Sequence, residues 1–293
     1  MNKVSAIFLI TTIKELTNDR LYLFLKNLSN YSISEIKIPL VIFFDNKLTE
    51  FYEKKLLLLL TFLGFYESFL EIEIVSNNIP DELNIYTLEK IDKIPKYGTS
   101  SGPNLHFYHT IKYKPTKYPI VALLETDCLF IKDRSIDIIN NSIKELNFWI
   151  YGSKYYGNVN MSDNYKDHIN GVGIYNRTID FLNFIEELMT YIENYIHTNK
   201  SHFINYDIAI HYLISNNRYL LIDSDEIINI STNRDINITY DDCLLIKPDI
   251  LLIHQKLKND EISENEYLLE KILNLYYFKE SYNTIKKNTI INL

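Results

Sequence analysis

Four nearly uninterrupted apolar runs in the first half of the chain constrain its fold more than any other feature. Each has the length and composition of a buried strand, and they lie at 4–12, 37–45, 70–76 and 119–131. Segments with helical spacing of apolar residues follow the first two runs, at 16–28 and 49–63. Strands that are apolar on both faces and alternate with helices indicate a mainly parallel sheet covered by helices on both sides. We therefore expect an α/β fold.

Polar side chains stand where these strands should end. They are Thr11, Thr12, Asp45, Glu125 and Asp127. In a parallel sheet the carboxyl ends of the strands form one edge, and ligands bind beyond it. Residues i and i+2 of an extended chain point to the same face, so Glu125 and Asp127 can reach one cation together. Two acids at the end of a buried strand are costly without a positive partner, which indicates a divalent metal site. The alternative is a pair of solvated acids.

The middle third of the chain is predicted to build the site. Six of the seven glycines lie between 98 and 173 and bracket the two acids. The loop at 96–105 contains Ser101 and Asn104 and opens a predicted helix that runs through Thr110. Its side chains could contact an anion at the helix N-terminus, or they could simply cap the helix. No Gly-Lys-Ser/Thr sequence follows, so the loop is not a Walker A motif.

The second half of the chain predicts further alternation of helix and strand. The pattern predicts a turn and strand at 168–175, helices at 178–196 and 205–214, and strands at 219–222, 244–246 and 250–254. The segment 260–293 is charged and rich in tyrosine, and we expect a helical tail that packs on the main body or on a partner.

Composition excludes some classes of function. The net charge of −8 and the pI near 5.4 argue against nucleic acid as the main partner, because phosphate binding needs a basic face. The two cysteines, Cys128 and Cys243, form no disulfide framework and no cysteine zinc pattern. The leucine run at 56–60 is too short to span a bilayer, which takes about 20 residues. The first twelve residues fit a core strand better than a signal peptide. We expect a soluble, cytoplasmic protein.

The order of several motifs resembles that of the GT-A fold glycosyltransferases. Glu125-Thr126-Asp127 resembles their DXD motif, and it follows an apolar strand about 120 residues into the chain. Asn170-Gly171, Asp207 and His254, the last followed by Gln255-Lys256, occur in the order that these enzymes show. The loop at 98–104 is similar to loops in some viral and bacterial members. The departures are Glu125 in place of the first Asp and the absence of a Gly and a Pro-Trp after the late histidine. Both leave the subfamily and the stereochemistry open.

The resemblance implies an organisation for the chain. A GT-A domain would span 1–258, with a nucleotide half at about 1–127 and an acceptor half at about 128–258. Its sheet would be mixed, Rossmann-like and mainly parallel, with flanking helices. The segment 259–293 would be a C-terminal helical extension through which a homodimer could form. If the chain is viral, it would work in the host cytoplasm.

The resemblance also implies roles for single residues. Asp127, His254 and Glu125 would hold Mn²⁺ or Mg²⁺, with the ribose as the alternative contact for Glu125. Asp207 would be the general base of an inverting enzyme or a sugar-hydroxyl contact in a retaining one, or its carboxylate would only stabilise a helix N-terminus. The remaining expected contacts to the donor are Thr11, Thr12, Asp45, Ser101, Asn104 and Lys256, and those to the sugar or acceptor are His168, Asn170, Gly171 and His211. For His254 the alternative is a core histidine, and for Lys256 a solvated lysine.

The expected function is therefore transfer of a sugar from a nucleoside-diphosphate donor, with a UDP-sugar favoured, to a hydroxyl of a glycan, protein or lipid-linked acceptor. A sugar nucleotidyltransferase is less favoured, because 11–16 has no glycine with which to hold a triphosphate. A catalytically degenerate protein that binds glycans or a partner chain is the alternative from another class.

Overall fold

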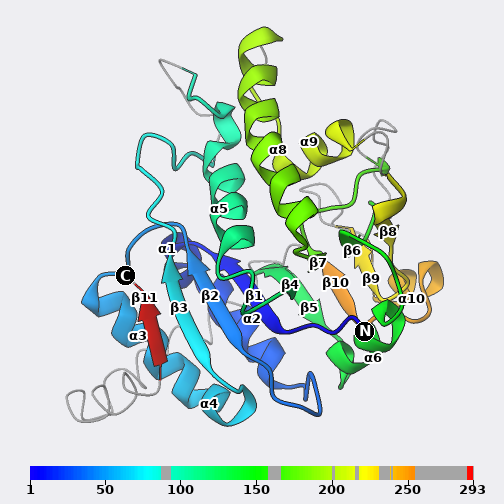
Figure 1. Ribbon diagram of the computed structural model, residues 1–293. Helices are drawn as coiled ribbons and strands as arrows, with labels where there is room; N and C mark the ends of the chain where they lie inside the picture. Colours follow the sequence, from blue (N-terminus) through cyan, green and yellow to red (C-terminus); the bar gives the residue numbers. More distant parts are fainter. Residues whose placement is uncertain are drawn as a thin grey trace.

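A mixed sheet forms the centre of the molecule (Figure 1). The computed structural model describes residues 1–86, 94–157, 166–199, 202–214, 218–230, 238, 240–254 and 289–292. The strands of this sheet are β1 Ala6–Thr11, β2 Leu40–Phe44, β3 Ile72–Ser76, β4 Ile120–Glu125, β6 Ile150–Gly152, β7 Gly173–Asn176, β8 Leu221–Asp223 and β11 Thr289–Asn292. Their order in space is β11-β3-β2-β1-β4-β7-β6-β8.

The strand directions bring several functional segments to one edge. The strands from β11 to β4 run parallel to their neighbours. Strand β7 runs antiparallel to β4, β6 antiparallel to β7, and β8 parallel to β6. The carboxyl ends of β1, β2 and β4 therefore meet at the same edge as the amino end of β7. This is the edge at which the sequence places Asp45, Glu125 and Gly171.

Helices cover both faces of the sheet because each strand alternates its apolar side chains between them. In β1, Ile7 and Leu9 face one helical layer, whereas Ala6 and Phe8 face the other. The first layer consists of α1 Ile13–Thr17, α2 Arg20–Ser29, α3 Glu50–Phe62, α4 Phe65–Ser68 and α6 Ser135–Ile143. The second consists of α5 Ser101–Lys112, α8 Ile179–Thr198 and α9 Tyr206–Leu213, with α8 rising above the sheet in Figure 1.

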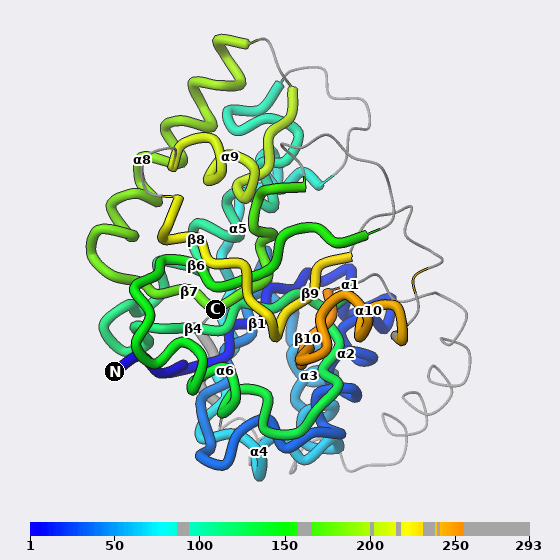
Figure 2. The backbone as a smooth tube through the Cα atoms, turned by 90° about the vertical axis from the view of Figure 1, so that its right-hand side faces the viewer, coloured from blue at the N-terminus to red at the C-terminus, as the bar shows by residue number. Residues whose placement is uncertain are grey.

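A small second sheet continues from the carboxyl edge of the first. It pairs β5 Cys128–Phe130 with β10 Leu252–His254, and β10 with β9 Ile227–Asn229. The helix α10 Tyr240–Ile246 packs beside it (Figure 2). Asn27 on α2 ties this sheet to the main body, because its side chain donates to the Phe130 carbonyl at 3.1 Å and accepts from the Phe130 amide at 2.8 Å.

The structure confirms the α/β fold and corrects three local predictions. The segment predicted as one helix at 16–28 is two helices, α1 and α2, which separate at Asp19 with its φ of 62°. The strand predicted at 244–246 is wrong, since these residues end α10 and Leu245 is 83% exposed. The helical tail is wrong at Thr289–Asn292, which forms β11 along the edge of β3. The tail at 260–288, with the homodimer contact expected there, lies outside the described residues.

Glu73 is a charged residue inside β3, and side chains from the segment 113–118 converge on it. Its side chain is fully buried and accepts hydrogen bonds from Tyr113, Lys114, Lys117 and Tyr118 at 2.5–2.8 Å. Burial alone would raise the pKa of the Glu73 carboxyl, but these four donors outweigh it and lower the pKa to about 2. The ionised form is therefore the one that the fold stabilises.

We predict that Glu73 makes the stability of the protein depend on acid. A pKa that is lower in the folded state gives a contribution that is complete above the unfolded value of about 4.5 and is lost as the pH falls from there towards 2. Glu73→Gln keeps the shape but has no charge to lose. The unfolding free energies of the two proteins should therefore differ most at pH 7 and approach each other as the pH falls from about 4.5 towards 2. A difference in unfolding free energy that stays constant from pH 7 to pH 3 would contradict this account.

Candidate active site

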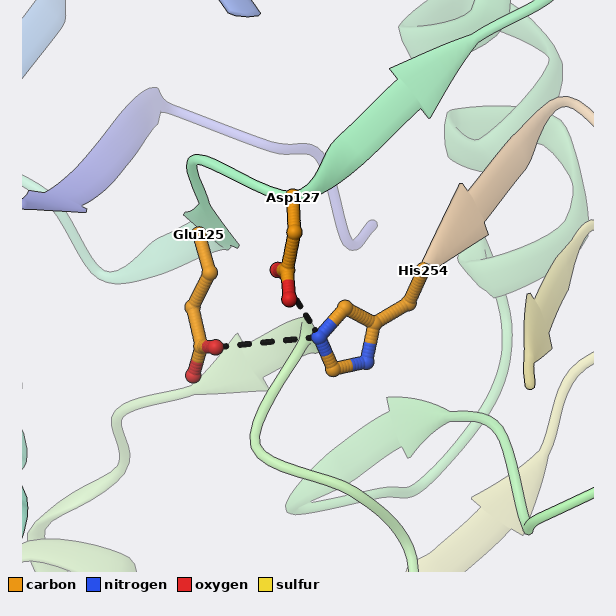
Figure 3. Close-up of side chains that lie close together, drawn as sticks. All are labelled: Glu125, Asp127 and His254. Atoms are coloured by element: carbon orange, nitrogen blue, oxygen red, sulfur yellow. Dashed lines mark ion pairs between the residues drawn. The ribbon is translucent and has the colours of Figure 1, made fainter. Parts of the chain in front are cut away.

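Three potential metal ligands meet where the two sheets join. Glu125 is the last residue of β4, and Asp127 precedes β5. The antiparallel pairing of β5 and β10 places His254 opposite Cys128, next to Asp127. His254 Nε2 lies 3.0 Å from Asp127 Oδ1 and 3.6 Å from Glu125 Oε2 (Figure 3). Asp127 and His254, which are 127 positions apart in the chain, therefore point at one another.

The donor set fits a divalent cation. One ligand atom from each of Glu125, Asp127 and His254 lies within 4.8 Å of the others. Burial lowers the pKa of the His254 imidazole, but Asp127 and Glu125 outweigh burial and raise it to about 10. Without a metal, the buried ring thus needs a proton to balance the acids. Two carboxylates and one imidazole are ligands that Mn²⁺ and related ions accept, and a cation can take the place of that proton.

A pocket of about 480 Å³ lies in front of the two acids at the carboxyl edge of the sheet. Glu125 and Asp127 line one side of it, and Thr12 and Asp45 come from the ends of β1 and β2. The other lining residues are Ile10, Lys14, Glu15, Asn18, Arg20, Asn84, Tyr86, Pro103, His106 and Tyr206. The structure therefore joins four of the predicted site residues around one cavity.

Asp45 is held in place by its neighbours. It is 7% exposed, and its carboxylate accepts from the Asn84 side chain at 2.9 Å and from the Ile13 amide at 3.4 Å. On the same wall, the Tyr86 hydroxyl lies 3.3 Å from His106 Nδ1. Burial lowers the pKa of His106 to about 3, so this imidazole is neutral at physiological pH. The wall offers amide, hydroxyl and imidazole groups in addition to one carboxylate.

Three predicted donor contacts, Thr11, Ser101 and Asn104, do not line the pocket. Ser101 and Asn104 are fully buried in α5, and Asn104 donates to the Ile204 carbonyl at 3.0 Å. The capping alternative does not describe them either, because Ser100 is the N-cap residue and makes no side-chain capping bond. Thr11 is also fully buried, and its hydroxyl donates to Glu15 at 3.3 Å. Lys256 lies outside the described residues.

The predicted acceptor residues form a second group. His168 Nε2 lies 3.2 Å from Asp207 Oδ2, and both side chains are largely buried. The other Asp207 oxygen accepts from the Ile208 amide at 2.9 Å. His211 stands one turn later on α9 and is 7% exposed, and burial and nearby positive charge lower the pKa of its imidazole. Asn170 accepts from the Val172 amide at 3.3 Å, which shapes the turn before β7.

Tyr206 links this second group to the pocket, and the sequence did not single it out. It lines the pocket beside Glu125 and Asp127 and stacks on Phe107 with ring centroids 3.9 Å apart. Gly171 makes room for it, because a Cβ at this position would lie 1.8 Å from the Tyr206 hydroxyl. Gly171 is therefore needed for packing against a wall of the pocket.

We predict that Gly171→Ala displaces Tyr206 and destabilises the fold by about 1–3 kcal/mol, as expected for overpacking a buried site. Urea unfolding gives the loss directly. Adding Tyr206→Phe to Gly171→Ala removes the atom that clashes most closely and should recover part of the loss. An unfolding free energy within ~0.5 kcal/mol of the wild type, the usual spread for a surface change, would show that the site is not tightly packed.

Glu15 is the second residue that sequence reasoning missed. It lines the pocket and accepts from the Thr126 hydroxyl at 2.6 Å and from the Thr12 amide at 2.9 Å. Thr12 and Glu15 form a capping box at the start of α1. The Thr-x-x-Glu spacing is visible in the sequence and marks the start of the helix. It does not reveal the contact with Thr126, which lies in the turn between β4 and β5, 111 positions away.

Comparison with known proteins identifies the fold. No known protein family matches the sequence, and no curated protein matches it. Mouse xyloside xylosyltransferase 1 superposes with a TM-score of 0.53 at 12% identity, over 87% of this chain and 98% of the mouse protein. The galactosyltransferase LgtC, solved with donor and acceptor sugar analogs, superposes with a TM-score of 0.51 at 14% identity, over 96% and 99%.

This chain has the GT-A fold. The mainly parallel sheet and its flanking helices match the architecture of these two glycosyltransferases. Among the described residues, none of the helices combines the length and the apolar character needed to cross a membrane.

Proposed function

We propose that the protein is a metal-dependent glycosyltransferase that uses a nucleoside-diphosphate sugar, with a UDP-sugar favoured as donor. The observation that carries this proposal is the cluster of Glu125, Asp127 and His254 beside the pocket at the carboxyl edge of a GT-A sheet. In this proposal residues 1–127 hold the nucleotide and the residues after them hold the acceptor, which is a glycan, a protein or a lipid-linked sugar.

Asp127, His254 and Glu125 would hold the ion, and their mixed oxygen and nitrogen donors favour Mn²⁺ over Mg²⁺. When bound, the ion stabilises the negative charge of the departing diphosphate. Asp127 and His254 are the less exposed pair, so they fix the position of the site, whereas the more exposed Glu125 can turn towards the ribose instead. Thr12 and Asp45 would contact the nucleoside, and Lys256 would contact a phosphate.

The acceptor would enter on the side of Tyr206 and the turn at 168–173. Asp207 would take the proton of the acceptor hydroxyl if the enzyme inverts, or bind a sugar hydroxyl if it retains. His168 lies 3.2 Å from the Asp207 carboxylate and holds it in place. Asn170 and His211 would complete the polar groups on this side. Gly171 leaves the space that the Tyr206 hydroxyl occupies.

A panel of nucleotide sugars tests the proposal. Each is incubated with the protein and Mn²⁺, and release of the nucleoside diphosphate is measured by chromatography, with EDTA in place of Mn²⁺ as the control. We expect slow hydrolysis of one donor, or a few, that requires the metal. Metal-dependent binding without release from any donor, even after addition of simple sugar acceptors, would instead favour a degenerate glycan-binding protein.

A further inference from the structure

The turn that carries the two acids is held by the buried threonine between them. Thr126 is 2% exposed, and its hydroxyl donates to Oε1 of Glu15 at 2.6 Å. Glu125 and Asp127 face His254, whereas this hydroxyl faces the helix α1. The turn is therefore held at its middle residue by a contact with α1, in addition to the contacts of the two acids with His254.

In the part of the chain that the structure describes, strand pairing reaches this turn at its two ends. The pairing of β1 with β4 ends where Ile10 lies opposite Glu125. The pairing of β5 with β10 begins where Cys128 lies opposite His254. Thr126 and Asp127 fall between these two ladders, so strand pairing leaves the orientation of Asp127 open. The side-chain hydrogen bond of Thr126 adds a contact within the turn itself.

Glu15 is itself fixed by the end of β1. Its Oε2 accepts from the Thr12 amide at 2.9 Å and from the hydroxyls of Thr11 and Thr12 at 3.3 and 3.2 Å. The Glu15 amide donates back to the Thr12 hydroxyl at 3.2 Å, which closes the capping box. One carboxylate therefore connects the ends of β1 and β4, the two neighbouring strands that border the pocket.

We infer that Glu15 is a positioning residue for the proposed metal site, and that through Thr126 it holds Asp127 in the orientation that faces His254. This inference rests on the metal-dependent function proposed above. Removing a residue that orients a metal ligand through a hydrogen bond typically lowers metal affinity by about 10- to 100-fold. The effect should appear in binding of the metal alone, without any sugar nucleotide.

Four variants separate positioning from charge. Thr126→Val and Glu15→Ala remove the two ends of the hydrogen bond. Thr126→Ser keeps the hydroxyl. Glu15→Gln keeps a group that can accept from the Thr12 amide and donate to the Thr126 hydroxyl, but it removes the negative charge. Tyr118→Phe is the matched control, since it also removes a hydroxyl that donates to a buried glutamate, at the opposite edge of the sheet.

Binding of Mn²⁺ is measured by the electron paramagnetic resonance signal of the free ion. We expect Thr126→Val and Glu15→Ala each to raise the Mn²⁺ Kd by about 10-fold or more. The double variant should be no weaker than the weaker single variant, because both remove the same contact. Thr126→Ser, Glu15→Gln and Tyr118→Phe should stay within about threefold of the wild type. Thermal unfolding in EDTA shows whether each variant is folded. If Glu15→Ala does not fold, the comparison of Thr126→Val with the wild type still tests the inference.

Two results would overturn the inference while leaving the proposed function intact. In the first, the wild type binds Mn²⁺ and Thr126→Val binds it equally well. In the second, Glu15→Gln is as weak as Glu15→Ala, which would show that Glu15 acts through its charge. A wild-type protein that does not bind Mn²⁺ would instead overturn the proposed function.

Discussion

Asp127→Asn should reduce turnover of the nucleotide-sugar donor by about 10³-fold, which corresponds to roughly 4 kcal/mol of transition-state stabilisation. The amide has nearly the same shape as the carboxylate but carries no charge. It would remove the carboxylate 3.0 Å from His254 Nε2 and leave Glu125 as the only acid of the cluster. Steady-state hydrolysis at saturating Mn²⁺ measures the loss.

The matched control for this variant is Asp180→Asn, an exposed aspartate in the first turn of α8. We expect it to retain full turnover, because it changes the net charge by the same amount far from the cluster. If Asp127→Asn keeps turnover within about threefold of Asp180→Asn, then Asp127 is not a metal ligand in the working enzyme and the proposed mechanism is wrong.

Arg177→Met should lower the free energy of unfolding by about 3–5 kcal/mol, the largest stability effect that we expect from one substitution. Arg177 is 4% exposed, and its guanidinium donates to four main-chain carbonyls at the end of α5 and in the turn before β4. These acceptors are the carbonyls of Ile111, Tyr113, Lys114 and Tyr118. Methionine fills similar space but leaves these buried acceptors without their donor.

The guanidinium also lies 4.9 Å from the centre of the Phe8 ring, so its loss opens the core at β1. Arg134→Met is the control, since its side chain is 58% exposed and pairs with Glu35 and Asp137 at the surface. Such a pair contributes about 1 kcal/mol or less. Urea unfolding of both variants gives the comparison, and equal losses would show that the carbonyl contacts of Arg177 contribute little.

Much of the fold follows from local patterns in the sequence. The four apolar runs form β1 to β4, because strands buried on both faces need apolar residues at nearly every position. Glu125 and Asp127 stand at the end of β4, so they lie at the carboxyl edge of the sheet. His254 ends an apolar run, and its pairing with Cys128 brings it to Asp127. The place of the two acids was therefore predictable from the strand and its end, whereas the part of His254 in the cluster was expected only from the resemblance to the GT-A glycosyltransferases.

Other features depend on contacts that no local pattern shows. The apolar triplet at 244–246 reads as a strand, but it is the last part of the helix α10, with Leu245 at the surface. Glu73 looks out of place in a strand until its four donors arrive from the segment at 113–118. Tyr206 lines the pocket because α9 packs against the turn before β7, where Gly171 leaves room for the Tyr206 hydroxyl. Contacts between residues far apart in the chain are set by tertiary packing, which outweighs the local preference of a segment for helix or strand.

The most direct test of the account is the affinity of UDP for the wild-type protein, measured by calorimetry with Mn²⁺ and again with EDTA. The cluster of Glu125, Asp127 and His254 beside the pocket predicts binding that requires the metal. We expect clear binding of UDP in Mn²⁺, no detectable binding in EDTA, and no binding by Asp127→Asn in either condition. Equal affinity in Mn²⁺ and in EDTA would contradict the central claim that a metal ion at this cluster holds the diphosphate.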